Sequence, residues 1–157
     1  DAWDAMIRGH YDDIYRYCFR RLGRKSDAQD AAQEVFLHFC RNFDSYAHRG
    51  KCLNYLYVIA RNLCINMMRK NVPLPLDDPD EVGAPAADMK HEDAAAIRAA
   101  VDSLPEEQKE VVILRFYHDL RLKTIAGIMG SGLSITKYRL YQGLKSLSAS
   151  LSKEDRS

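Results

Sequence analysis

The sequence predicts an all-α fold of two small helical domains joined by an acidic, proline-rich linker. Apolar residues recur at three- and four-residue steps in both halves of the chain, which is the period of an amphipathic helix. Residues 1–70 contain no strand-like alternation and no proline, whereas four of the five prolines lie within residues 71–88. We therefore expect a first domain over residues 1–70, a linker over 71–93 and a second domain over 94–157.

The first two helices are predicted from apolar stripes and from the signals at their ends. One stripe covers residues 7–22, and Gly23 follows it where a left-handed residue would close a helix. Ser26 and Gln29 then form a capping-box signature for a second helix, whose stripe continues to about Phe43. These signals predict a helix, a tight turn and a second helix.

A third stripe and the linker complete this half of the sequence. The stripe covers residues 53–67 and ends in Arg69 and Lys70, which favour the negative end of a helix. The run from residue 71 to 93 is rich in proline and acidic residues and has no helical apolar period. We expect it to be an extended, mobile tether.

The second domain is predicted to contain a helix-turn-helix. A helix is expected over residues 91–103, and Pro105 together with a Ser-x-x-Glu box at residues 103–106 marks the start of the next helix. A short stripe then ends at Gly130, and a longer helix begins near residue 134. Two helices joined by a short glycine-bearing turn are typical of a helix-turn-helix.

The sequence carries no convincing pattern of a catalytic or metal site. No nucleophile with a base, paired carboxylates or phosphate loop is evident, and the glycine-bearing segment 130–134 lacks the Gly-Lys that phosphate binding needs. We expect neither a zinc site nor a disulfide framework, because no CxxC pair occurs among the widely spaced cysteines Cys18, Cys40, Cys52 and Cys64. We therefore expect no enzyme and no cofactor. No run approaches the roughly 18 apolar residues of a membrane span, so we also expect a cytoplasmic protein.

The charges become informative when the chain is divided at the linker. The whole chain has 23 basic and 22 acidic residues, a net charge of +1. Residues 1–70 carry +4, residues 71–97 carry −6 and residues 98–157 carry +3. Two basic blocks flanking an acidic segment are expected if both blocks bind a polyanion such as DNA.

Basic and aromatic residues are interleaved in two places. Around the third helix this mixture suits single-stranded nucleic acid, because bases stack on rings while cations neutralise phosphate. At the start of the last helix it suits the DNA major groove. Solvated basic helix faces with tyrosines in the core are the alternative in both places. The first set is Tyr46, Arg49, Lys51, Tyr55, Tyr57, Arg61, Arg69 and Lys70. The second set is Lys137, Tyr138, Arg139, Tyr141 and Lys145.

Three segments resemble one known family. Residues 30–36, DAAQEVF, resemble the DxxQEVF signature in region 2 of the bacterial extracytoplasmic-function (ECF) sigma factors of RNA polymerase. Residues 55–62, YLYVIARN, are similar to the WLYxIARN segment of that family, and residues 104–111, LPEEQKEV, to the LPEEQREV start of its region 4. Together the matches span about residues 8–151 in the family's order.

The resemblance implies a non-catalytic promoter-specificity subunit with three sets of site residues. It implies that core RNA polymerase binds the second helix through its β′ clamp helices, with the β flap as a further contact, and that an anti-sigma factor controls the protein. The polymerase-binding positions are Asp30, Gln33, Glu34 and Phe36. The positions implied to melt and hold the promoter −10 element are Arg49, Lys51, Tyr55, Tyr57, Arg61 and Asn62. Those implied to read the −35 element are Ser134, Lys137, Tyr138, Arg139 and Tyr141.

The sequence departs from the family pattern mainly in the helix-turn-helix. Ser131 and Thr136 stand where the family has apolar residues, and Gly127 replaces an acidic one. A polar group left unsatisfied in a small core costs about 1–3 kcal/mol. Two alternatives stay open. One is a sigma-like interaction module with a degenerate DNA-binding domain, which the polar residues favour. The other is an autonomous helix-turn-helix regulator that would bind as a dimer, against which the DxxQEVF-like segment argues.

Overall fold

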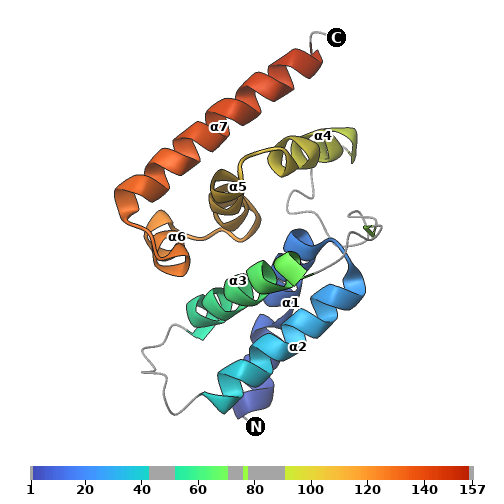
Figure 1. Cartoon of the computed structure of the whole chain (residues 1–157), viewed down its shortest axis with the longest axis vertical. Coiled ribbons are helices and arrows are strands. Elements are labelled where there is room, and N and C mark those ends of the chain that lie inside the picture. The colour runs from blue at the N-terminus through green and yellow to red at the C-terminus, as the bar shows by residue number, and fades with distance from the viewer. Residues whose placement is uncertain (1, 43–51, 71–75, 78–90, 156–157) are drawn as a thin grey trace. The chain divides into compact units, whose positions relative to one another are not determined.

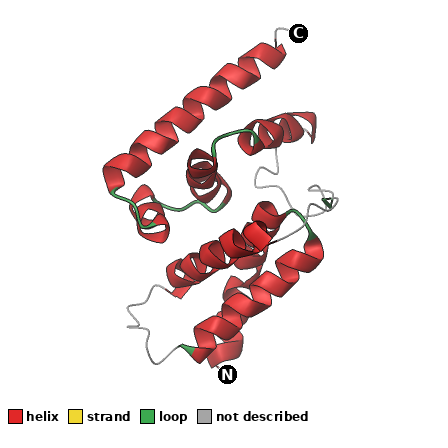
Figure 2. Cartoon of the chain, in the orientation of Figure 1, coloured by secondary structure: helices red, strands yellow, loops and turns green. Residues whose placement is uncertain are grey.

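The computed structural model describes residues 2–42, 52–70, 76–77 and 91–155. Throughout this part of the chain the regular structure is helical (Figures 1 and 2). The chain divides into two compact units, Asp1–Val82 and Gly83–Ser157, here called the N-terminal and the C-terminal unit. The division falls inside the segment that the sequence predicts as the linker. The all-α prediction with two helical domains is confirmed.

The N-terminal unit is a bundle of three helices, each of which packs against the other two. They are α1 (Ala2–Leu22), α2 (Lys25–Arg41) and α3 (Cys52–Lys70). Their shared core consists of fully buried apolar side chains from all three stripes, since the 3.6-residue period keeps those residues on one face of each helix. The largest of these side chains are Ile14, Tyr17, Val35, Phe39, Leu56 and Tyr57.

The α1–α2 turn has the glycine that the sequence predicts but not the predicted capping box. Gly23 has a φ of 81°, and its N–H donates a 2.8 Å hydrogen bond to the carbonyl of Phe19. Helix α2 begins at Lys25, so Ser26 lies inside the first turn instead of preceding the helix, and the predicted capping box is wrong. The Lys25 N–H instead donates to the carboxylate of Asp77, at 2.7 Å.

The other end of α2 is closed by Asn42, through both its backbone and its side chain. Its backbone N–H and its Nδ2 donate to the carbonyl of His38, at 3.1 and 2.9 Å. The predicted end at Phe43 lies just outside the described residues.

The C-terminal unit is built around its long last helix. Its elements are α4 (His91–Asp102), α5 (Glu106–Val112), the π-helical turn η3 (Ile113–Tyr117), α6 (Leu122–Met129) and α7 (Leu133–Asp155). Helix α7 packs against α4, α5 and α6. A Cβ on Gly143 would lie 3.0 Å from Cγ2 of Val112, so this glycine allows α5 and α7 to approach closely.

The end of α5 and the start of η3 carry a run of buried residues. Val111, Val112, Ile113 and Leu114 are each at most 1% exposed. Four successive residues of a helix point around its whole circumference, so this stretch is covered on all sides. The wider π-helical turn begins at Ile113 and shifts the register of the side chains that follow.

The helix-turn-helix lies in α6, α7 and the turn between them. Gly130 has a φ of 65°, in the left-handed region, and the N–H of Ser131 donates a 2.9 Å hydrogen bond to the carbonyl of Ala126. These features close α6 as the sequence predicts. Helix α5 begins just after Pro105, also as predicted, but the Ser103 side chain donates backward to the Ala100 carbonyl, so the Ser-x-x-Glu box does not form.

Candidate functional site

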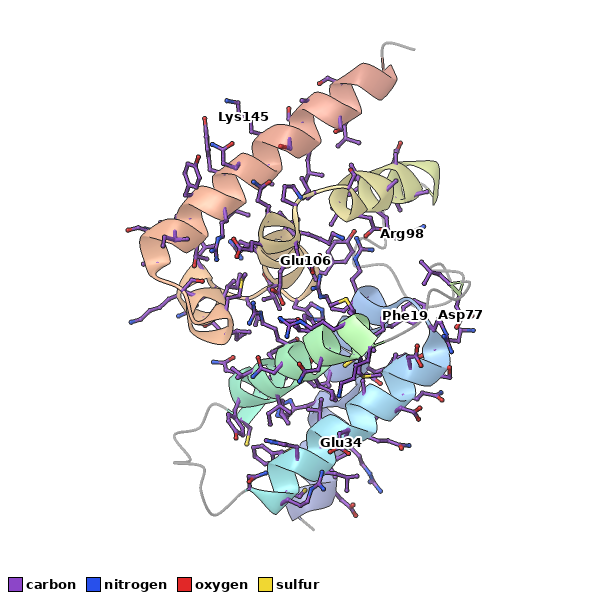
Figure 3. The ribbon with its side chains drawn as sticks, in the orientation of Figure 1. Phe19, Glu34, Asp77, Arg98, Glu106 and Lys145 are labelled. Atoms are coloured by element: carbon purple, nitrogen blue, oxygen red, sulfur yellow. The ribbon has the colours of Figure 1, made fainter. Side chains whose placement is uncertain are left out.

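One face of α2 presents polar side chains to solvent, while the opposite face is buried. Asp30, Gln33 and Glu34 are all exposed, and they lie one helical turn or less apart. Figure 3 labels Glu34 about midway along α2. Its Oε1 accepts a hydrogen bond from Nη2 of Arg41, two turns further along. Three of the four predicted polymerase-binding residues thus share one accessible surface.

Phe36, the fourth of these residues, lies in the core. Its side chain is 5% exposed and stacks on Tyr11 of α1, with ring centroids 6.0 Å apart. The ring therefore fixes α2 against α1 and is not presented to solvent. Leu37, which the sequence reasoning missed, is 56% exposed beside Gln33 and Glu34 and adds an apolar group to this surface. Exposed Asp30, Gln33, Glu34 and Leu37 form what we call the α2 face.

The side chains predicted to bind the −10 element are divided between surface and core. Asn62 is exposed, whereas Arg61 and Tyr55 are half-buried. The Tyr55 ring is tilted against Phe39, with centroids 5.7 Å apart. Because position 62 is two turns after position 55, these two residues share one side of α3. Arg49 and Lys51, with the rest of the predicted loop before α3, lie outside the described residues.

Tyr57 belongs to the core of the N-terminal unit. It is 1% exposed and meets Tyr17 edge to face, with ring centroids 5.9 Å apart. Burial raises the pKa of the Tyr57 phenol, since the charged form would lose its hydration. A ring in this position cannot stack on a base without leaving the core.

The first turns of α7 present four of the five residues predicted to read the −35 element. Ser134, Lys137, Tyr138 and Tyr141 are exposed and recur at the three- and four-residue steps of one helix face. Tyr138 and Tyr141 are each 63% exposed. This surface, called the α7 face below, offers a hydroxyl, a cation and two aromatic rings.

Arg139 points away from the α7 face and joins three parts of the C-terminal unit. Its Nη1 donates a 2.9 Å hydrogen bond to Oγ of Ser131 in the turn. Its Nη2 lies 3.0 Å from Oε2 of Glu107 near the start of α5. The guanidinium group therefore braces the turn and α7 against α5.

The polar substitutions in the helix-turn-helix are satisfied within the fold. Thr136 is fully buried, and its Oγ1 donates a 2.9 Å hydrogen bond to the carbonyl of Gly132. Ser131 accepts the bond from Arg139. A Cβ on Gly127 would meet no atom within 4 Å, so this glycine leaves no gap in the core. The predicted desolvation cost at residues 131 and 136 therefore does not arise, and the cost of about 1 kcal/mol for a glycine inside a helix remains at Gly127.

Two family models match the two halves of the chain. Residues 6–72 match the family of Sigma-70 region 2, and residues 94–147 match that of Sigma-70 region 4. The RNA polymerase sigma factor SigV of Bacillus subtilis is 30% identical over 152 residues, which cover 96% of this chain and 92% of SigV. The chain belongs to the ECF RNA polymerase sigma factors. This family is non-enzymatic, and its members direct transcription initiation and bind DNA.

Other ECF sigma factors and solved sigma factor structures are similar over most of the chain. SigW of Bacillus subtilis is 29% identical and covers 94% of this chain, which in turn covers 87% of SigW. SigE of Mycolicibacterium smegmatis is 30% identical, and this chain spans 62% of its length. The structure of RpoE with the anti-sigma factor NepR from Bartonella quintana has a TM-score of 0.76 at 17% identity, covering 96% of this chain and 97% of RpoE. The structure of CnrH with the cytosolic domain of CnrY has a TM-score of 0.74 at 16% identity, covering 97% and 88%.

The described part of this sigma factor contains neither a metal cluster nor a membrane-spanning helix. No three His, Cys, Asp or Glu side chains gather there as metal ligands would, and all four cysteines are free thiols. No helix within the described residues is both long and apolar enough to cross a bilayer. The surfaces that remain as candidate sites are the α2 face, the exposed side of α3 and the α7 face.

Proposed function

We propose that this sigma factor binds core RNA polymerase through the α2 face and directs promoter-specific initiation. The observation that carries the proposal is the exposure of Asp30, Gln33 and Glu34 on one side of α2, in a chain whose family has this role. Carboxylates and an amide around an exposed Leu37 suit a partner helix with basic and apolar groups. The β′ clamp helices of the polymerase are the proposed partner.

The two units would then act on two promoter elements. In the proposed division, residues 1–70 form region 2, residues 71–93 the linker and residues 94–157 region 4. Tyr55, Arg61 and Asn62, together with Arg49 and Lys51, would hold the melted −10 element. The α7 face would read the −35 element, since Lys137 can reach phosphate or guanine and Ser134 can bond to several bases. Region 4 would also contact the β flap.

An anti-sigma factor is the proposed regulator. The similar RpoE and CnrH structures are complexes with NepR and with the cytosolic domain of CnrY. The RpoE and CnrH chains share the fold of this chain, and the exposed apolar side chains of α7 give a partner a surface to cover. Those side chains are Leu133, Ile135, Tyr138, Tyr141 and Leu144.

The test is reconstituted transcription with purified core polymerase and this protein. We expect initiation from a specific promoter, and a Gln33→Ala/Glu34→Ala variant should bind core polymerase about tenfold more weakly, equivalent to about 1.4 kcal/mol. Asp12→Ala changes an exposed carboxylate on α1 and serves as the matched control. If core polymerase does not bind the chain, the proposal is refuted; if the double variant binds like the parent, the α2 face is the wrong surface.

A further inference from the structure

Helix α2 begins without a cap from its own neighbourhood. The N-cap residue, Arg24, makes no side-chain capping hydrogen bond, and Ser26 is exposed within the first turn. The first N–H groups of a helix have no partner inside the helix, so a helix start of this kind needs an acceptor from elsewhere. In this structure the acceptor comes from a distant segment of the sequence.

Asp77 supplies the acceptor and is itself fixed by a second hydrogen bond. Its Oδ2 accepts a 2.7 Å hydrogen bond from the N–H of Lys25, across 52 residues of sequence. Its own N–H donates a 2.8 Å hydrogen bond to the carbonyl of Gly23. The two bonds run in opposite directions, as in a capping box, and together they fix both the backbone and the side chain of Asp77. Figure 3 shows Asp77 next to the first turn of α2.

The residue before Asp77 occupies the space that the glycine leaves. A Cβ on Gly23 would lie 2.6 Å from Cδ2 of Leu76. Gly23 adopts the left-handed φ of 81°, and Leu76, which is 72% exposed, lies over it at the edge of the turn. The negative carboxylate of Asp77 also lies at the positive end of the α2 dipole.

From these contacts we propose that Asp77 is a positioning residue, which caps α2 from the linker and attaches the start of the linker to the α1–α2 turn. The chain that joins the two units then begins after residue 77 and not after α3. Thirteen residues, 78–90, lie between Asp77 and the start of α4 at His91. Fully extended they would reach about 45 Å, against about 70 Å for the twenty residues that follow α3.

The attachment is a property of the free protein and does not require the proposed polymerase binding. If that binding occurs, the capped helix is also the one that carries the α2 face. Failure of the Asp77 attachment and failure of polymerase binding by the α2 face can therefore be told apart.

Amide hydrogen exchange by NMR on the full chain, without polymerase, tests the attachment. In the parent protein the amides of Lys25 and Asp77 should exchange at least about tenfold more slowly than in an unstructured peptide. In Asp77→Ala the Lys25 amide should exchange about fivefold faster, the factor for loss of an N-cap worth about 1 kcal/mol. Asp77→Asn should retain most of the protection, since Asn caps nearly as well as Asp.

The control is Asp78→Ala, which removes the same charge from the next residue and should leave both amides as in the parent. Unprotected exchange of the Asp77 amide in the parent protein would overturn the proposal, and this measurement needs no variant. Equal Lys25 exchange in Asp77→Ala and in the parent, with helix content unchanged by circular dichroism, would overturn it as well.

Discussion

Replacing Phe36 with Ala separates a role in the core from a role at a partner surface. The ring is 5% exposed and stacks on Tyr11. Removing a buried Phe side chain costs about 3–5 kcal/mol, because the lost transfer free energy is increased by the cavity left behind. With a urea m-value of about 1 kcal/mol per molar for a unit of this size, the midpoint of unfolding should fall by on the order of 3 M. Phe36→Leu should cost about 1–2 kcal/mol, since it leaves a smaller cavity.

The assay is urea unfolding followed by the fluorescence of Trp3, the single tryptophan, which lies in α1 and so reports on the N-terminal unit. Glu34→Ala is the matched control, because it changes an exposed side chain two positions away. This control should shift the midpoint by less than about 0.5 M, as expected for a surface substitution. A Phe36→Ala protein that unfolds at the parent's urea concentration but binds polymerase weakly would refute the reasoning, since Phe36 would then be a contact residue.

Three further predictions concern buried groups and α7. Because burial raises the pKa of Tyr57, its phenol should remain neutral at a pH where exposed tyrosines are already ionised. The stability of the N-terminal unit that depends on the neutral phenol is fully present below the unfolded pKa of about 10 and should be lost as the pH rises through the folded pKa. Ultraviolet titration of the parent protein and of Tyr57→Phe measures this difference. Cys18 and Cys64 are both buried and should resist a thiol reagent in the folded protein. The hydrogen bond with Cys64 and burial also raise the pKa of the Cys18 thiol. Both cysteines should be labelled only after denaturation, and rapid labelling of the folded protein would contradict this. Lys137→Ala should weaken promoter binding and reduce its salt slope by about 1, whereas Arg139→Ala should mainly destabilise the C-terminal unit; equal salt slopes for Lys137→Ala and the parent would remove Lys137 from the DNA surface.

The helices could be predicted from the sequence because their signals are local. A stripe with a 3.6-residue period, a glycine after it and a proline at the next start all act within a few residues. The cap of α2 could not be predicted in this way, since its acceptor is 52 residues from Lys25. Ser26 and Gln29 matched the local pattern of a capping box, but the carboxylate of Asp77 accepts the hydrogen bond at the start of α2.

The sequence did not show which predicted site residues are exposed and which lie in the core. Phe36 and Tyr57 belong to the apolar stripes that predicted the helices, and the same stripes place them in the core. The family motifs include both residues, but a motif does not distinguish a side chain that supports a surface from one that forms it. Arg139 illustrates the converse, because neither its charge nor its helix position reveals that Ser131 and Glu107 bind its guanidinium group.

The π-helical turn in the C-terminal unit sets the direction in which the chain leaves α5 toward the helix-turn-helix. Each residue of an α-helix rotates the chain by about 100°, so one residue added or removed turns the rest of that helix by this angle. The turn η3, Ile113–Tyr117, lies between the α5 segment that packs on α7 and the start of α6. Deleting one residue there would keep every side chain of the α7 face but would change the direction in which the chain leaves η3. Residues 118–121 would then have to absorb the change for α6 to keep its packing on α7. An exchange of this region with that of a related protein must therefore keep the length of η3 as well as the side chains of the α7 face.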